Sequence, residues 1–108
     1  MHKEKWSKKE KAIARAAFEK AYKKECVQII EKLKKKSLKL SRPEDIWDLH
    51  DYLSEIRKEI DQKYDYRYSV LILVFAKLLK QNWLKIDDLE NLSPDKIDRI
   101  KSLVNLKF

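Results

Sequence analysis

The chain has 108 residues and contains no glycine. Glycine makes up ~7% of an average protein, so roughly seven or eight would be expected. Phosphate-binding loops, dinucleotide-binding fingerprints, the nucleophile elbow of hydrolases and EF-hand loops all need glycine where backbone approaches a ligand or φ is positive. Tight β-hairpin turns favour glycine as well. The missing glycine therefore excludes those sites and favours an all-α fold.

The rest of the composition agrees with an all-α chain in a reducing cytoplasm. Charged residues make up 41% of the sequence, and there are only two prolines. A single cysteine excludes an intramolecular disulfide, and two histidines argue against a Cys/His zinc site, so we expect no metal and no cofactor. No apolar run reaches the ~18 residues of a membrane span, and the N-terminus lacks a signal-peptide core.

The first predicted helix covers about residues 7–36. Ser7 and Glu10 have the spacing of a capping box at its start. Its apolar positions form one stripe along the helix, and they are Ala14, Phe18, Ala21, Tyr22, Cys26, Ile29, Ile30 and Leu33. A helix of ~30 residues is long for so small a domain. The stripe is therefore expected to pack against a helix from a second copy of the chain.

The second predicted helix opens with Ser41-Arg42-Pro43-Glu44, interpreted as a second capping box with proline in the first turn. Apolar residues then recur at spacings of three and four, which predicts one narrow buried seam; they are Ile46, Leu49, Leu53, Ile56 and Ile60. The two long helices together present more apolar edge than one copy can cover. We therefore expect a homodimer whose interface includes Leu49, Leu53, Ile56 and Ile60.

A third helix is predicted over about residues 66–81. Residues 70–76 are apolar on every side, which predicts the buried centre of the fold, with Val74, Phe75 and Leu78 in the core. A helical turn around 86–90 and a last helix from Ser93-Pro94 follow; the last helix is expected to bury Ile97, Ile100, Leu103 and Val104. Together, these helix predictions give one helical domain, 1–108, with long dimer-forming helices in 1–64 and a helical head in 65–108.

The positive charge is concentrated at one end of the chain. Residues 1–40 carry 14 Lys and Arg against 5 Asp and Glu, a net of +9, whereas residues 41–108 carry 12 against 13, a net of −1. Such a basic segment can attract phosphate backbones or an anionic surface. Lysine outnumbers arginine 21 to 5, however, and arginine is favoured for reading bases. A solvated lysine face and a nucleic-acid-binding helix both remain open, and the solvated face is the preferred interpretation.

The second helix also carries the best candidates for a binding site. Trp47, His50, Asp51 and Ser54 share a stripe beside the seam, and Arg57 follows two turns after His50. An aromatic anchor with both charge signs is typical of a binding hot spot, where Trp and Arg are enriched. Catalysis is a weaker interpretation, because a serine inside a helix has no oxyanion hole. The alternative is that these residues merely occupy a half-buried and solvated surface.

Residues 44–80 carry a dense resemblance to a known family. The matching residues are Asp45-Ile46-Trp47-Asp48-Leu49-His50-Asp51-Tyr52-Leu53-Ser54, Arg57, Glu59-Ile60-Asp61, Lys63-Tyr64-Asp65, Arg67, Ser69-Val70, Val74-Phe75-Ala76 and Leu78-Leu79-Lys80. This stretch resembles the fluorescence recovery protein of cyanobacteria. The match continues more loosely through residue 103, and the first helix shares only scattered positions.

The resemblance implies a helical homodimer that is not an enzyme. Proteins of that family bind the photoactivated orange carotenoid protein, chiefly its C-terminal domain, speed its return to the orange state and free it from the phycobilisome. The implied partner-binding residues here are Trp47, His50, Asp51, Arg57, Leu73 and Arg99. Leu73 replaces an aromatic residue of the cyanobacterial proteins, and the lysine-rich first helix is unlike theirs. An adaptor of the same fold with another protein partner, in a non-photosynthetic bacterium, therefore remains an alternative.

Overall fold

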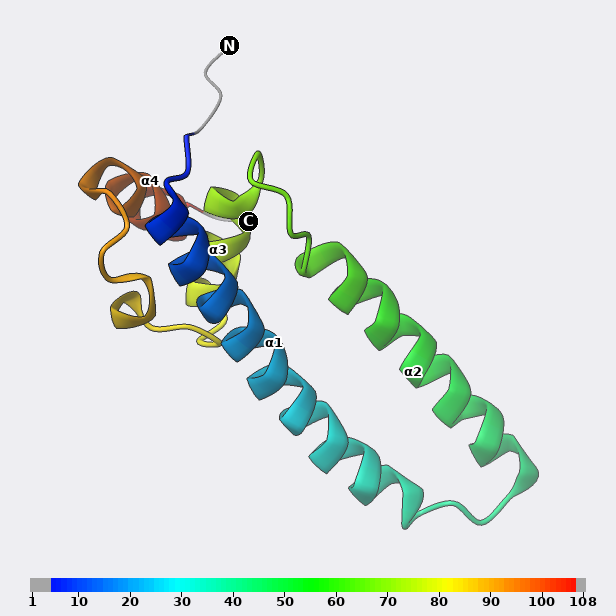
Figure 1. Ribbon diagram of the computed structural model, residues 1–108. Helices are drawn as coiled ribbons and strands as arrows, with labels where there is room; N and C mark the ends of the chain where they lie inside the picture. Colours follow the sequence, from blue (N-terminus) through cyan, green and yellow to red (C-terminus); the bar gives the residue numbers. More distant parts are fainter. Residues whose placement is uncertain (1–4, 107–108) are drawn as a thin grey trace.

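The computed structural model describes residues 5–106, and every regular element in that range is helical (Figure 1). The elements are α1 (Lys8–Ser37), α2 (Pro43–Lys63), α3 (Leu71–Lys80), the short 3₁₀ helix η1 (Ile86–Leu89) and α4 (Pro94–Val104). The predicted all-α fold is confirmed. The outermost parts of the predicted 1–108 domain, residues 1–4 and 107–108, lie outside the described residues.

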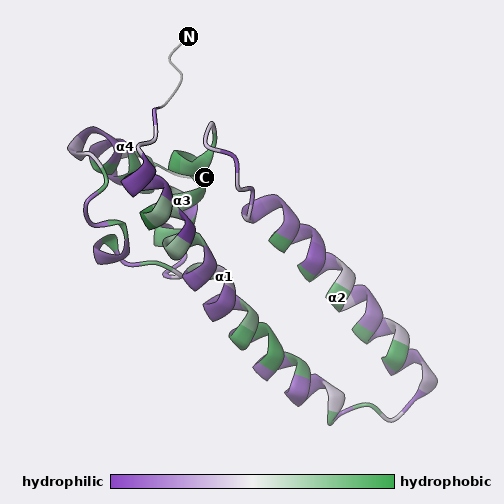
Figure 2. Ribbon diagram, viewed as in Figure 1, coloured by the Kyte–Doolittle hydropathy of each residue, from purple (hydrophilic) through white to green (hydrophobic). Residues whose placement is uncertain are grey.

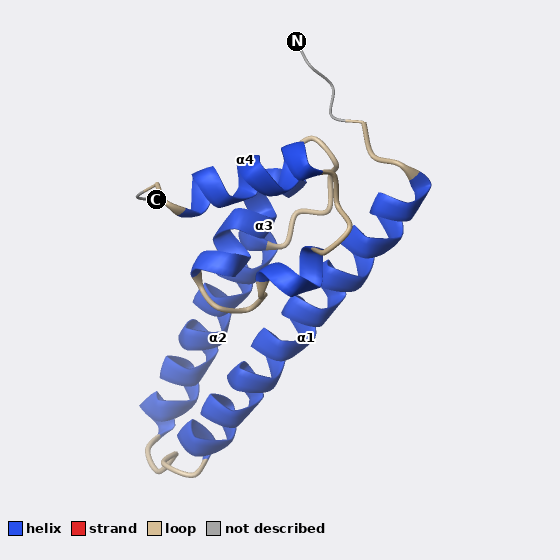
Figure 3. Cartoon of the chain, turned by 90° about the vertical axis from the view of Figure 1, so that its left-hand side faces the viewer, coloured by secondary structure: helices blue, strands red, loops and turns tan. Residues whose placement is uncertain are grey.

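The molecule is elongated, with principal extents of 54 × 25 × 24 Å. α1 and α2 run antiparallel as a long hairpin, and α3, η1 and α4 gather around the first half of α1 (Figures 1 and 3). We call α3, η1, α4 and the first half of α1 together the head. α1 belongs to both parts, because its buried residues all lie between positions 10 and 21.

α3 is the centre of the head. Phe75, Leu71 and Leu78 are completely buried, and Val74 is nearly so, which confirms the predicted core. Alanines of α1 allow that helix to approach closely, and apolar side chains from the segments after α3 cover the rest; they are Ala14, Ala17, Ala21, Leu84, Leu89, Leu92 and Ile100. The apolar character of α3 is evident in Figure 2, where this helix is almost uniformly green.

The predicted helix over 66–81 is wrong at its start, since α3 begins at Leu71. Residues 64–67 have no regular structure and a turn occupies 68–70. Tyr64, Tyr66 and Tyr68 occur at every second position, and an extended backbone directs such side chains to one side. The Phe18 ring of α1 lies 5.4 Å from the Tyr64 ring and 4.8 Å from the Tyr66 ring. We call residues 64–68 the tyrosine strap.

The helix starts follow side-chain capping. Ser7 caps α1 as predicted: its hydroxyl accepts from the Glu10 N–H at 3.1 Å. The predicted box at Ser41 is wrong, because Pro43 takes the first helical position and Arg42 becomes the N-cap. The carboxylate of Asp45 then accepts from the backbone N–H groups of Arg42 at 2.9 Å and Ser41 at 3.0 Å. These hydrogen bonds lower the pKa of Asp45 to about 2.

Asparagine takes the place of glycine where the chain must turn after a helix. Asn82, which follows α3, has φ of 66°, and Asn91, which follows η1, has φ of 75°. Asparagine tolerates this left-handed region better than most residues, because its short polar side chain bonds locally. These two asparagines thus adopt the positive φ values that glycine often provides at such turns.

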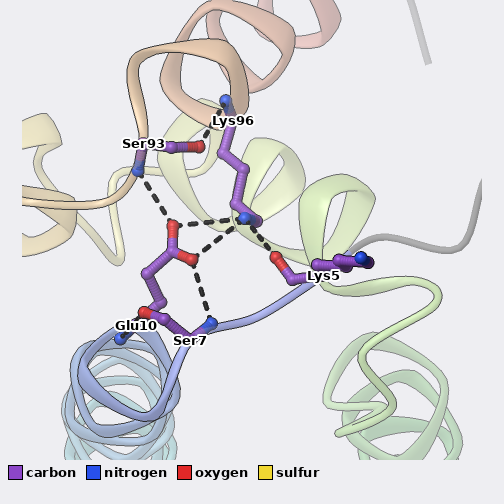
Figure 4. Close-up of polar contacts among 5 residues, drawn as sticks. All are labelled: Lys5, Ser7, Glu10, Ser93 and Lys96. Atoms are coloured by element: carbon purple, nitrogen blue, oxygen red, sulfur yellow. Dashed lines mark hydrogen bonds and ion pairs between the residues drawn. The ribbon is translucent and has the colours of Figure 1, made fainter.

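A buried ion pair ties the start of α1 to the start of α4 (Figure 4). The Lys96 ammonium lies 3.1 Å and 3.2 Å from the two carboxylate oxygens of Glu10 and donates to the Lys5 carbonyl at 2.6 Å. The Ser93 N–H donates to Glu10 Oε2 at 2.9 Å. Burial raises the pKa of Glu10, but hydrogen bonds from Ser93, Ser7 and Lys96 outweigh it and lower the pKa to about 2. The carboxylate is thus ionised and fully bonded.

We expect Phe75→Ala to destabilise the fold by ~3–5 kcal/mol, because it empties a fully enclosed site. A small domain has only about 5–15 kcal/mol of total stability, so the variant is close to unfolding. Leu73→Ala is the matched control, since Leu73 of the same helix is 38% exposed. Thermal unfolding followed by circular dichroism measures both. Equal, small shifts in the two variants would contradict the assignment of Phe75 to the core.

Candidate functional site

The hairpin presents apolar side chains that one chain does not bury. None of the α2 residues is buried, and the predicted seam of Leu49, Leu53, Ile56 and Ile60 is half-buried or exposed. A single chain therefore leaves this seam uncovered, and its burial in a dimer interface stays a prediction. α1 contributes further exposed apolar side chains on its second half, namely Tyr22, Val27 and Ile30. The alternation of green and purple along both helices is visible in Figure 2.

Polar contacts link α1 to the end of α2 and to the residue that follows it. Glu25 of α1 receives hydrogen bonds from the Lys63 ammonium at 2.6 Å and from the Tyr64 hydroxyl at 2.8 Å. Burial and the neighbouring Glu25 carboxylate raise the pKa of Tyr64. Between the helices runs a groove of about 320 Å³ whose apolar lining includes Ile29, Ile56 and Trp83. The apolar side chains on the hairpin are thus available to a further surface.

Trp47, His50 and Asp51 lie together on the first turns of α2, near the closed end of the hairpin. Trp47 is 65% exposed. The His50 ring nitrogen Nδ1 lies 3.6 Å from Asp51 Oδ1, and both side chains are open to solvent. This is an aromatic anchor beside two polar side chains, as the sequence predicts.

Arg57 stands two turns further along α2, about 10 Å beyond His50 by the rise of a helix. Its Nε lies 3.6 Å from Asp61 Oδ2, and its side chain is 83% exposed. An exposed pair of this kind adds little to stability. Trp47, His50, Asp51 and Arg57 together are called the hairpin surface below.

Leu73 and Arg99 belong to the head and not to the hairpin surface. Leu73 is an exposed residue of α3, and Arg99 is exposed on α4, where it lines a shallow depression with Asp98, Ser102 and Leu103. The first turns of α2 lie at the far end of the molecule from the head (Figure 1). The six predicted residues thus divide between the hairpin and the head, and all six are exposed.

The exposed residues of the hairpin and the head are of the kinds that bind protein partners by burial and charge. Exposed tryptophan, leucine and arginine side chains bury well against a protein partner, and the charges set orientation. Among residues 5–106 there is no group of three His, Cys, Asp or Glu side chains placed to hold a metal ion. No helix in this range is long and apolar enough to cross a membrane.

Sequence reasoning missed two exposed features. Leu38 in the loop between α1 and α2 is 86% exposed, and Leu40 is exposed beside it; two leucines in a lysine-rich connection were the available signal. Lys77 of α3 lies one turn after Leu73 on the same side of the helix, and its spacing of four was the signal there.

The fold is that of a small all-helical protein in which a long hairpin joins a helical head, and the candidate binding residues are exposed on both parts. A family model described as "Photoprotection regulator fluorescence recovery protein" matches residues 6–104. The chain belongs to this family of photoprotection regulators. It is 42% identical to the fluorescence recovery protein of Synechocystis sp. (strain ATCC 27184 / PCC 6803 / Kazusa) over 101 residues, which cover 94% of this chain and 93% of that protein.

Solved structures of the family share the fold. The fluorescence recovery protein of Fremyella diplosiphon is 48% identical, with a TM-score of 0.88 over 94% of this chain and 100% of that one. The protein from Synechocystis sp. PCC 6803 is 41% identical, with the same TM-score and the same coverage. The predicted family is confirmed, and the relatives are named as regulators rather than enzymes.

We expect the wild-type chain to sediment as a dimer, at twice its mass of 13.1 kDa. Leu53→Glu should shift it toward the monomer, because the substitution places a charge in the centre of the unburied seam. Lys58→Glu is the matched control, since Lys58 is exposed on another side of α2, where it pairs with Glu55 at 3.4 Å. Sedimentation velocity at micromolar concentration makes the measurement, and a compact wild-type monomer would contradict the prediction.

Proposed function

We propose that this protein binds the photoactivated orange carotenoid protein, chiefly its C-terminal domain, accelerates its return to the orange state and promotes its detachment from the phycobilisome. The observation that carries the proposal is the family match over residues 6–104 together with the exposure of Trp47, His50, Asp51 and Arg57. These are the positions that the resemblance marks as important, and every one is accessible on α2. The action takes place as a homodimer in the cytoplasm.

The proposed mechanism needs no covalent chemistry. A protein that accelerates reversion must bind the transition state, or the compact product-like arrangement, better than the open active state. Exposed residues on both the hairpin and the head of an elongated molecule suit this task, because they can contact two parts of a partner at once. The hairpin surface supplies Trp47 and Arg57, and the head supplies Leu73 and Arg99.

A second candidate is an adaptor of the same fold for a different protein. Leu73 favours it, because leucine offers less contact area than the aromatic residue of the cyanobacterial relatives. The lysine-rich α1 also leaves nucleic-acid binding as a minor candidate, given the net charge of +9 in residues 1–40. A steep fall of DNA affinity with salt concentration would support that role.

The assay is the dark recovery of absorbance of a photoactivated orange carotenoid protein, with and without this protein. We expect acceleration, at a concentration raised by the loss of one aromatic anchor. Arg57→Leu should require about tenfold more protein for the same rate, since leucine cannot replace the bidentate contacts of a guanidinium. Circular dichroism should show the variant to be as helical as the wild type.

Lys58→Leu, on an exposed position one residue away, is the control and should behave like the wild type. An unchanged recovery rate at tens of micromolar wild-type protein, with no complex by size exclusion, would refute the proposed partner. A loss of helicity in Arg57→Leu that parallels its loss of activity would make Arg57 a structural residue instead.

A further inference from the structure

One side of α3 stays uncovered although the rest of the helix is the core of the head. Leu73, Lys77 and Lys80 occur at spacings of four and three, so they follow one another along a single side of the helix. Leu73 and Lys80 are exposed and Lys77 is half-buried. This side therefore presents an apolar side chain followed by two ammonium groups.

The lysines open onto a cleft between α3 and the last turns of α2. Its volume is about 500 Å³, and it is lined by Lys77, Lys80, Gln81, Glu59, Gln62 and Lys63. We call it the head cleft. Its walls carry amide and ammonium donors and one carboxylate, so it suits a ligand that accepts hydrogen bonds.

The lysines that line the head cleft differ in the hydrogen-bond acceptors that their ammonium groups have. The Lys63 ammonium forms an ion pair with the Glu25 carboxylate at 2.6 Å, and the Lys80 ammonium donates to the carbonyl of Leu106. The Lys77 ammonium makes no ion pair or hydrogen bond with the described part of the chain, and the residue as a whole is half-buried. An ammonium without an acceptor in its own chain can form a charge-assisted hydrogen bond with a carboxylate supplied from outside.

We propose that the head cleft receives an acidic and apolar segment of the partner protein, with a carboxylate against Lys77 in the cleft and an apolar side chain against Leu73 beside the cleft. The two contacts would lie about one helical turn apart, ~6 Å. This inference rests on the proposed function, in which the partner is a protein. It makes Lys77 a residue that selects the partner segment.

The cleft and Leu73 beside it favour a protein segment over a nucleic acid or another polyanion. Glu59 on the wall of the cleft makes no ion pair with residues 5–106, and its repulsion grows with the number of negative charges brought in, so a chain of phosphates is disfavoured more than a single carboxylate. Leu73 offers an apolar contact that a phosphate backbone does not use. A single carboxylate beside an apolar group matches both features.

The test measures affinity of the dimer for photoactivated orange carotenoid protein at low salt, with Lys77→Gln, Lys77→Glu and wild type. We expect about tenfold weaker binding for Lys77→Gln and a larger loss for Lys77→Glu, because the latter adds repulsion. Lys35→Gln and Lys35→Glu, which make the same charge changes on an exposed position of α1, should stay within twofold. Carbodiimide coupling of the wild-type complex should join Lys77 to an Asp or Glu of the carotenoid protein, as read by mass spectrometry.

Equal affinities of the Lys77 and Lys35 variants, in a wild-type protein that does bind and accelerate recovery, would overturn the head-cleft inference and leave the proposed function standing. A wild-type protein that neither binds nor accelerates would overturn both. Weakened binding of a duplex DNA fragment by Lys77→Gln, equal to its loss with the carotenoid protein, would assign Lys77 to general attraction of anions and also overturn the inference.

Discussion

The structure depends on the need to cover α3. This helix is apolar around most of its circumference, so it must be enclosed from several directions within a chain of 108 residues. The first half of α1, the tyrosine strap, η1 and α4 provide that enclosure. The buried ion pair of Glu10 and Lys96 joins the start of α1 to the start of α4 and so holds these two helices together. Breaking such a pair on one side leaves a buried charge and is costly.

Building the head in this way leaves the hairpin without a core of its own. The buried alanines of α1 all precede position 22, and beyond them no apolar residue of α1 or α2 is fully buried. Helices draw most of their stability from packing an apolar face. The hairpin is therefore the part of the molecule that a second copy would complete in the proposed dimer, and the same exposed length carries Trp47 and Arg57.

Much of this arrangement could be predicted from the sequence. Ser7 with Glu10, Ser93 with Pro94 and the apolar run around Phe75 gave three helix positions, because capping and periodicity are local effects. The tyrosine strap was missed because aromatic residues at alternate positions next to an apolar run also fit a helix start. The start of α2 was predicted one residue too early, with Ser41 instead of Arg42 as the N-cap, because serine is a favoured capping residue. Only the backbone shows that the Asp45 carboxylate reaches the free N–H groups of Ser41 and Arg42.

The long-range features could not be predicted in the same way. Glu10 and Lys96 are 86 positions apart, and nothing local joins them. Trp47, His50, Asp51 and Arg57 were correctly predicted to share α2, but their separation from Leu73 and Arg99 is set by the length of the hairpin. The incomplete burial of Leu49, Leu53, Ile56 and Ile60 depends on how α2 lies against α1, which is a tertiary arrangement and not a local effect.

Amide hydrogen exchange as a function of protein concentration tests the central claim most directly, which is that the head is complete within one chain and the hairpin is completed by a second copy. Amides that are protected only by local contacts exchange through low-energy openings. The account predicts that protection in α2 and in the second half of α1 falls on dilution, whereas protection in α3 stays constant. Protection of the hairpin that is as high as that of α3 and independent of concentration would contradict it.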